Sequence, residues 1–449
     1  MTYDTTNDDG ADDERVQTNA DRGASEDAGT TAATDPVDVF SGAPMDLRPG
    51  SDDCYKCSTC DTECPVAAVD DEFPGPKFQG PEQWRLKRDD DHDIDPSIDR
   101  CSNCMRCDQV CPSGVPLSRM HNTARGAYVE EQLPKLSRKY LRNRLLANYG
   151  VLARIGSRVP GLTNAVMGNR FVQQVNEKLL GITAEREFPA FAEETFRAWY
   201  EDRGGPRVES DEKRVAYFHG DYANYNTPEV GKALVRVYEH FGYEVRVPEQ
   251  RCSGTPMFAN GMLSDARRDA RVNVANLSAL IERGYDVVCS CTSCSMALRQ
   301  EYPELFDLPG TKRVAEHTYE AIEYLRVEED LSGALSGAAI DPERFAYHVP
   351  CHARNQGLAG QTVEVLGVLL GAEAVDVGDS CSGISGTYGW KEERYDVSMR
   401  IGSGMFEHIE EAEADAGLTE CPTCAMQMEH GTGQEVQHPI TVFEDALCE

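Results

Sequence analysis

The sequence predicts a multi-domain chain with an all-α cysteine-rich module first, a helical linker next, and two repeated α/β cysteine-rich domains last. Three observations predict this order. One spacing of four cysteines occurs twice near the start, the charge reverses in the middle of the chain, and strand-like runs alternate with helical stretches after residue 210. Such alternation is typical of α/β domains with largely parallel sheets.

The composition is strongly acidic. The chain of 449 residues has 77 Asp and Glu against 44 Lys and Arg, and its formal net charge is -33. Phosphate backbones bind cationic surfaces, so we do not expect nucleic acid as a partner. Abundant carboxylates with little lysine are typical of halophilic proteins, whose surface charges are screened by concentrated salt, and the alternative is simply an acidic protein.

The start of the chain carries few residues that could form a core. Residues 1–53 contain 14 acidic and three basic residues among small polar ones, so we expect residues 1–47 to be a disordered acidic tail. Neither a signal peptide nor an apolar run long enough for a membrane span occurs. We therefore expect a peripheral protein on the cytoplasmic face of the cell membrane, with its cysteines reduced.

The pattern Cys-x2-Cys-x2-Cys-x3-Cys-Pro occurs twice in the predicted first module, residues 48–122. In two-cluster ferredoxins, three closely spaced cysteines hold one [4Fe–4S] cluster and the fourth ligates the other. The spacing therefore predicts cluster one on Cys54, Cys57, Cys60 and Cys111, and cluster two on Cys101, Cys104, Cys107 and Cys64. A zinc knuckle is the alternative, but zinc sites use paired ligands. Helix-like stretches such as Gln83–Arg88 and His121–Gln132 favour an all-α ferredoxin-type module.

A basic amphipathic helical linker is predicted for residues 123–210. Between Lys135 and Lys178, nine Lys and Arg face one acidic residue, for a net charge of +8. Apolar residues recur there at helical spacing and would give the segment one apolar face. They are Leu141, Leu145, Tyr149 and Leu152. Such a helix either binds a membrane surface or a partner, or packs its apolar face on its own domain.

The second half of the chain is duplicated, with repeat one predicted at residues 211–325 and repeat two at 340–449. Cys252-Ser253-Gly254 recurs 129 positions later as Cys381-Ser382-Gly383, and Cys291-x2-Cys294 recurs 130 positions later as Cys421-x2-Cys424. Near-equal offsets indicate a duplicated domain. The strand-like runs are Arg214–His219, Tyr243–Val247, Asp286–Ser290, Phe345–Val349 and Ala374–Val377, and the clearest helical stretches are Thr227–Phe241 and Leu263–Arg283.

Several chemistry-bearing residues directly follow these strand-like runs, where ligands bind in open α/β sheets. Repeat two offers enough thiols for a candidate third iron–sulfur cluster: Cys351, Cys381, Cys421 and Cys424. Repeat one offers Cys252, Cys291 and Cys294, with Asp221 at the fourth position. Cys289 is either a substitute ligand or a buried strand residue. We expect the nearby His219, His348, His352 and His438 to be packed side chains rather than ligands.

The doubled Cys-Ser-Gly and Cys-x2-Cys elements resemble the cysteine-rich CCG domains in the B subunit of heterodisulfide reductase. With two ferredoxin motifs in front, the layout is similar to the family of the C subunit of anaerobic glycerol-3-phosphate dehydrogenase. The resemblance covers residues 50–445 and is supported by the stretches His219–Asn226, Cys381–Gly389, Cys421–Gln427 and Gln437–Thr441. It implies an electron-transfer subunit for glycerol catabolism in anaerobic respiration. Such a subunit would have no catalytic residue of its own, and would relay electrons from flavin-containing dehydrogenase subunits toward membrane quinone.

The same residues also allow other functions. Heterodisulfide reductase repeats carry Cys-Cys-Gly, whereas Ser253 and Ser382 stand here at the second cysteine, which disfavours a disulfide-cleaving cluster. The iron–sulfur subunits of glycolate oxidase and lactate utilisation share the same domains, and zinc-stabilised interaction modules are a third possibility. No Gly-x-Gly-x-x-Gly motif follows a strand and no Walker A motif occurs, so we expect the flavin on another subunit.

Overall fold

The computed structural model describes residues 53–86, 93–336, 338, 340, 344–367, 373–378 and 380–448. The predicted acidic tail, residues 1–47, lies outside the described residues. None of the helices in the described ranges combines the length and the apolar composition needed to cross a lipid bilayer.

The first module is built from short helical elements around two cysteine loops. Within residues 53–86 and 93–132, every element that the structure describes is helical. The elements are α1 (Thr59–Thr62), η2 (Phe78–Glu82), α2 (Gln83–Leu86), η3 (Pro96–Arg100), α3 (Arg106–Gln109), α4 (Leu117–Ala127) and η4 (Tyr128–Gln132). Helix α4 runs across residue 122, so the boundary predicted there falls within a helix.

The predicted linker is helical, but the prediction of one apolar face along it is wrong. Asn148 has a non-helical backbone (φ -100, ψ 38) and divides the stretch into two helices. Leu141 and Leu145 therefore lie on the first helix, and Tyr149 and Leu152 on the second. The linker helices are α5 (Arg138–Ala147), α6 (Tyr149–Gly156), α7 (Pro160–Met167), α8 (Arg170–Leu180) and α9 (Phe196–Asp202).

Each repeat contains a four-stranded parallel sheet, and the strand order is the same in both. Repeat one has β1 (Arg214–Phe218), β2 (Glu244–Arg246), β3 (Asp286–Cys289) and β4 (Thr318–Glu320), in the order β2-β1-β3-β4. Repeat two has β5 (Arg344–Tyr347), β6 (Glu373–Asp376), β7 (Ala416–Leu418) and β8 (Val436–Gln437), in the order β6-β5-β7-β8. The two α/β repeats predicted from the cysteine offsets are thus present in the topology.

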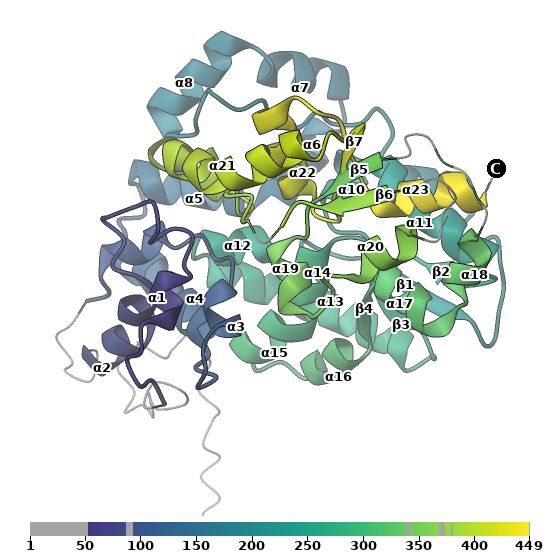
Figure 1. The fold of residues 1–449 in the computed structure, drawn as a ribbon, viewed down its shortest axis with the longest axis horizontal. Coiled ribbons are helices and arrows are strands. Elements are labelled where there is room, and N and C mark those ends of the chain that lie inside the picture. The colour runs from purple at the N-terminus through teal and green to yellow at the C-terminus, as the bar shows by residue number, and fades with distance from the viewer. Residues whose placement is uncertain are drawn as a thin grey trace, which may run out of the picture. The chain divides into compact units, whose positions relative to one another are not determined.

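The repeats share one hydrophobic core. Helix α11 (Pro228–His240) buries one apolar stripe, which includes Val230, Leu234 and Val237, against the sheet of repeat one. It lies beside α23 (Pro439–Leu447) of repeat two, as Figure 1 shows. One cluster of buried side chains therefore contains residues from both sheets. Helix α13 (Leu263–Ile281) packs in a second cluster with the other side of β1 and β3.

The remaining helices are short, apart from two long ones in repeat two. The long helices are α21 (Tyr395–Glu411) and α22 (Pro422–Thr432). The short elements of repeat one are α10 (Tyr222–Tyr225), α12 (Thr255–Ala259), α14 (Thr292–Met296), η5 (Ala297–Glu301), α15 (Tyr302–Leu305), α16 (Thr311–Glu316), α17 (Ala321–Glu328) and α18 (Leu331–Leu335). Those of repeat two are α19 (Cys351–Asn355), α20 (Gln361–Leu366), η6 (Tyr388–Trp390) and η7 (Glu392–Arg394).

A buried group of charges joins the first module, the linker and repeat two. The Asp99 carboxylate lies 3.2 Å from Lys139 Nζ, 3.6 Å from Lys391 Nζ and 3.9 Å from Arg394 Nη2. Burial opposes ionisation of Asp99, but the surrounding cations outweigh it and lower its pKa to about 2. Removing one of these charged side chains would leave a buried charge without compensation. The charged group therefore holds the first module, the linker and repeat two in one arrangement.

The repeated Cys-Ser-Gly element needs its glycine in both repeats. Gly254 and Gly383 have φ of +97 and +81, in the left-handed region that favours glycine. A Cβ on Gly383 would overlap the main-chain carbonyl of Ser398 on α21, and one on Gly254 would lie 3.0 Å from the Phe258 ring. Each glycine therefore lets the loop with its cysteine and serine lie close against a helix.

Candidate metal centres

The eight cysteines of the first module form two groups in the structure. Cys54, Cys57, Cys60 and Cys111 line one small cavity. Cys64, Cys101, Cys104 and Cys107 line another. The fourth cysteine of each motif therefore lies with the three cysteines of the other motif, which is the grouping that the spacing predicts. Ligation of iron by these thiols stays a prediction.

The two loops have matched backbone geometry that suits a cluster. Lys56 and Ser58 have φ of 59 and 66, and Asn103 and Met105 have φ of 62 and 63 at the corresponding positions of the second motif. Left-handed backbone is uncommon for residues other than glycine and costs on the order of 1–3 kcal/mol each. These turns curl each loop around its thiols. All 17 cysteines of the chain are free, so the donor set fits iron–sulfur clusters.

The cluster-two cavity lies beside a buried cation. The Arg125 side chain is fully buried and donates hydrogen bonds to the Cys101 carbonyl (3.0 Å), to the Asn103 and Asn122 amide oxygens (3.2 Å each) and to the Phe258 carbonyl (3.3 Å). Burial opposes the Cys101 thiolate, but Arg125 and then His121 outweigh it and lower the pKa of Cys101 to about 6. The surroundings of the cluster-two cavity therefore favour negative charge.

A neighbouring carboxyl does not cancel that cation at neutral pH. Glu301 of η5 is fully buried and interacts with Arg125 and Asn103. Burial raises the pKa of Glu301 to about 8. Burial favours the neutral form of this carboxyl, so it offsets the Arg125 charge less than an ordinary carboxylate would.

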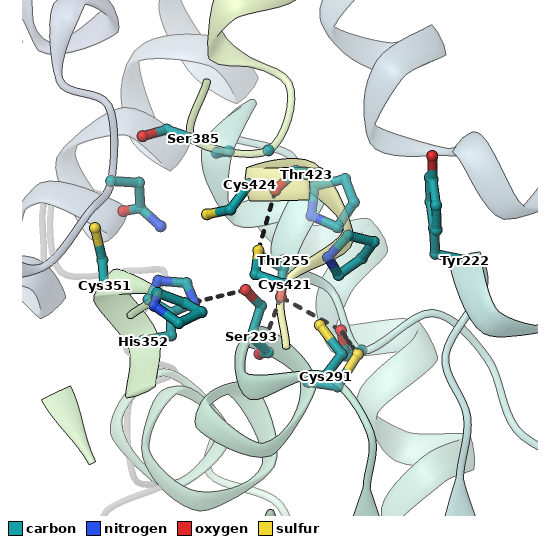
Figure 2. Close-up of a pocket in the computed structure, with 18 of the residues that line it drawn as sticks. Tyr222, Thr255, Cys291, Ser293, Cys351, His352, Ser385, Cys421, Thr423 and Cys424 are labelled. Carbon is teal, nitrogen blue, oxygen red and sulfur yellow. Dashed lines mark hydrogen bonds between the residues drawn. The ribbon is translucent and has the colours of Figure 1, made fainter. Parts of the chain in front are cut away.

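The four cysteines of repeat two converge at the carboxyl end of its sheet. Cys351 and Cys421 closely follow β5 and β7, at the point where the strand order reverses. The Cys351 and Cys381 sulfurs are 3.8 Å apart, and the Gly383 amide donates to Cys381 Sγ at 3.4 Å. A hydrogen bond from the Cys424 thiol lowers the pKa of Cys421 to about 6. Figure 2 shows Cys351, Cys421 and Cys424 in the same close-up.

Repeat one presents three cysteines and a carboxylate in the same arrangement. The Asp221 side chain takes the place that Cys351 has in repeat two and is hydrogen-bonded to Cys252. Its Oδ2 atom is buried without a hydrogen-bond partner, and burial raises its pKa to about 6. Cys291 and Cys294 complete the set. Cys289 is fully buried in β3 among apolar side chains, which favours its interpretation as a core residue.

The serine of each Cys-Ser-Gly element contacts the last cysteine of the same repeat. Ser253 Oγ and Cys294 Sγ are 3.4 Å apart, and Ser382 Oγ and Cys424 Sγ are 3.3 Å apart. A hydroxyl can donate a hydrogen bond to a thiolate, but it does not add a fifth sulfur. The sequence pointed to this contact only through the serine that follows the cysteine in both Cys-Ser-Gly elements.

The two repeats face a common cavity of about 160 Å³. Its lining includes Cys291 and Cys294 from repeat one, Cys351 and Cys424 from repeat two, and Cys104 of cluster two. In the part of the chain that the structure describes, no three His, Cys, Asp or Glu side chains close around a single metal ion. The thiols line cavities instead, and those of repeat two that line the shared cavity are Cys351, Cys421 and Cys424.

The cluster-two cavity lies directly against repeat two. Cys64 and Cys381 belong to one packed cluster of buried side chains, and the Asn355 amide donates to the Cys104 carbonyl at 3.3 Å. Neither Arg125 nor Asn355 was predicted as a site residue. Their positions depend on how the domains dock, and no local spacing in the sequence carries that information.

Family models match the same parts of the chain. Residues 50–115 match the 4Fe-4S dicluster domain, and residues 215–299 and 345–429 each match the cysteine-rich domain called CCG. These matches confirm the ferredoxin-type module and the two cysteine-rich repeats, and both kinds of domain indicate iron–sulfur clusters.

Curated relatives carry the same domains. The C subunit of the anaerobic glycerol-3-phosphate dehydrogenase of Escherichia coli (strain K12) is 35% identical over 399 residues, which is 88% of this chain and 98% of the relative. The B subunit of the fumarate reductase (CoM/CoB) of Methanothermobacter marburgensis is 28% identical over 49% of this chain and 43% of its own. The lactate utilization protein A of Geobacillus thermodenitrificans is 32% identical over 48% of this chain and 90% of its own.

Replacing Arg125 by Met should lower the reduction potential of cluster two and leave cluster one unchanged. The reason is that a buried cation stabilises the reduced, more negative state. We expect a shift of several tens of millivolts, since a tenfold change in a one-electron equilibrium is about 59 mV. Anaerobic redox titration followed by electron paramagnetic resonance (EPR) measures both potentials. Arg125→Lys keeps the charge, so its cluster-two potential should stay close to that of the wild type. An unchanged cluster-two potential in Arg125→Met would contradict this account.

Proposed function

The chain belongs to the family of the C subunit of anaerobic glycerol-3-phosphate dehydrogenase, and from this premise we propose that it relays electrons within a glycerol-3-phosphate dehydrogenase complex. Electrons would come from a flavin-containing subunit that oxidises glycerol 3-phosphate, and would leave toward membrane quinone. The chain would supply no substrate-oxidising residue. Its task would be to hold redox centres in a row.

The observation that carries this proposal is the order of the thiol sets. Cluster one lies at the surface, where Cys57 is exposed. Cluster two is buried beside Arg125 and contacts repeat two through Cys104. A row of this kind gives electrons a path from a partner at the surface to the interior. The buried Arg125 charge would stabilise an electron on cluster two.

We assign [4Fe–4S] clusters to the two cysteine sets of the first module and a third iron–sulfur cluster to the repeat-two set. The repeat-two set has four thiols at one sheet edge, which is the number of cysteines that ligate a [4Fe–4S] cluster. Ser382 shares a hydrogen bond with Cys424 where a fifth thiol would be needed for a disulfide-cleaving cluster. This substitution supports electron relay over disulfide reduction. In repeat one, Asp221 and three thiols form a weaker set for which we assign no cluster type.

We also propose that the linker helices α6, α7 and α8 bind the membrane surface. Large apolar side chains are more than 40% exposed along these helices, and Leu162 and Phe171 reach 67% and 72%. Arg154, Arg158, Arg170 and Lys178 are exposed among them, in a chain whose net charge is -33. Exposed apolar and basic side chains on one group of helices suit an interface with anionic lipid. If the cytoplasm is salt-rich, as the composition suggests, the apolar contacts would dominate because charges are screened within about 3 Å at 1 M salt.

The relay predicts that the chain alone cannot oxidise glycerol 3-phosphate. Adding the substrate to the anaerobic, iron-loaded protein should leave its EPR spectrum unchanged. Adding a catalytic amount of the flavin-containing dehydrogenase of the same complex should then reduce the clusters. Reduction by substrate without the flavoprotein would contradict the proposal, as would a failure of the flavoprotein to reduce any centre.

A third cluster predicts an iron content above that of two cubes. Two [4Fe–4S] clusters account for about eight irons per chain, and a third of the same type would bring the number to about 12. Cys381→Ser should lose the additional iron and keep the rest, whereas Cys448→Ser, which changes an exposed cysteine outside every set, should lose none. Iron and sulfide counts on anaerobic preparations measure this. Equal iron in wild type and Cys381→Ser, or zinc in place of the additional iron, would contradict the assignment.

Membrane binding by the linker can be tested with charged substitutions on its exposed face. Ile155→Asp with Leu162→Asp should abolish flotation with vesicles that contain phosphatidylglycerol, since each buried apolar side chain contributes about 1.5–3 kcal/mol. Val327→Asp changes an equally exposed apolar residue on α17 and serves as the matched control. Vesicle binding that survives the double substitution would exclude this face as the membrane contact.

A further inference from the structure

The cluster-one cavity reaches the surface of the protein. Of the cysteines in the four thiol sets, all of which lie in the described ranges, Cys57 alone is exposed. Tyr55 also lines this cavity and is 84% exposed, and Pro112 of the second motif lines it and is exposed as well. We call the exposed residues of the two loops the cluster-one face, and they are Tyr55, Lys56, Cys57, Pro112 and Gly114.

The two loops that form this face contain no carboxylate. Residues 54–60 and 111–117 include one charged side chain, that of Lys56, although 77 of the 449 residues of the chain are acidic. Lys56 Nζ lies 3.1 Å from a Glu82 carboxylate oxygen. Lys77, which lines the cavity, pairs with Asp61 at 3.2 Å. The face is therefore close to neutral in a chain whose net charge is -33.

A face of this composition suits contact with another protein. The centres of protein interfaces are depleted in Asp, Glu and Lys and enriched in Tyr, and an exposed rigid aromatic side chain is a typical anchor. Like charges that face one another across an interface weaken binding, so a surface without carboxylates lets a second acidic protein approach. The face is small, and interfaces between redox partners are at the small end of the range for specific contacts.

We propose that the cluster-one face is the docking site for the flavin-containing dehydrogenase subunit, with Tyr55 as its anchor. This inference rests on the proposed function, because it needs a partner that delivers electrons. An electron donor has to come close to the first centre of the row, and Cys57 is where a thiol reaches the surface. Two one-electron transfers oxidise the reduced flavin and reduce cluster one twice in succession, each electron moving on before the next arrives, and the two flavin protons pass to water.

Three substitutions on the face and one control separate docking from folding. Tyr55→Asp removes the anchor and introduces a carboxylate, whereas Tyr55→Phe keeps the ring. Lys56→Glu reverses the charge of the one charged residue in the two loops. Leu136→Asp is the matched control, because Leu136 is 88% exposed, lies between η4 and α5 and does not line the cavity. No variant changes a cysteine, so iron content should equal that of the wild type in all four.

The measurement is the dissociation constant between the full-length, iron-loaded protein and the flavin-containing subunit of the same complex, by biolayer interferometry without oxygen. Tyr55→Asp should weaken binding by about tenfold, as loss of an interface anchor does. Lys56→Glu should weaken binding in the same direction, and Tyr55→Phe and Leu136→Asp should leave it unchanged. Midpoint potentials and the rate of reduction by dithionite, a small reductant that needs no docking site, should be the same in every variant.

The outcomes that overturn the inference are distinguishable from failure of the proposed function. Wild-type protein that neither binds the flavoprotein nor is reduced by it contradicts the proposed function. Wild-type affinity in Tyr55→Asp leaves the proposed function in place and overturns the docking site alone. If Tyr55→Asp instead abolishes self-association or vesicle binding while flavoprotein binding persists, the face belongs to a second copy or to lipid, and the docking site is again overturned.

Discussion

Contact between the cysteine loop of cluster two and helix α19 of repeat two is the constraint on which the rest of the structure depends. Electron transfer weakens steeply with distance, so centres in separate domains can exchange electrons quickly only where the domains hold them close together. The Cys104 carbonyl accepts a hydrogen bond from Asn355, and Cys64 packs in one apolar cluster with Cys381. The buried charges around Asp99 and the shared core of the two repeats keep these loops in contact. The duplication itself matters because it places a second thiol set across the same cavity.

Charge is arranged differently at the surface and in the interior. The chain is acidic overall, yet the buried side chains near cluster two and at the domain junction include Arg125, Lys391 and Arg394. Charges in the interior are screened much less than those at the surface. A cluster held in this interior would therefore respond mainly to the nearest buried cation. On this account an acidic surface can coexist with an interior that would accept electrons.

Features with a local cause could be predicted from the sequence, and features that depend on docking could not. The cysteine spacing predicted which thiols gather around each cavity of the first module, because covalent loop geometry limits where they can lie. The offsets between cysteine motifs predicted the duplicated α/β domain. Strands β4, β7 and β8, with two or three residues each, were missed, and β7 reads Ala-Gly-Leu without any β-branched residue. The Asn148 side chain contacts Asp265, and the Arg125 side chain contacts the Phe258 carbonyl, and both partners lie more than 100 positions away in the sequence.

The most direct test of the account is the magnetic interaction between centres in the fully reduced protein. Two ferredoxin-type centres and a third centre beside cluster two should give EPR signals that are broadened and split by their neighbours, and Cys381→Ser should simplify this pattern while leaving the pair in the first module. A single sharp signal from isolated centres, or a spectrum that Cys381→Ser leaves unchanged, would contradict the claim that the thiol loops of separate domains hold neighbouring redox centres.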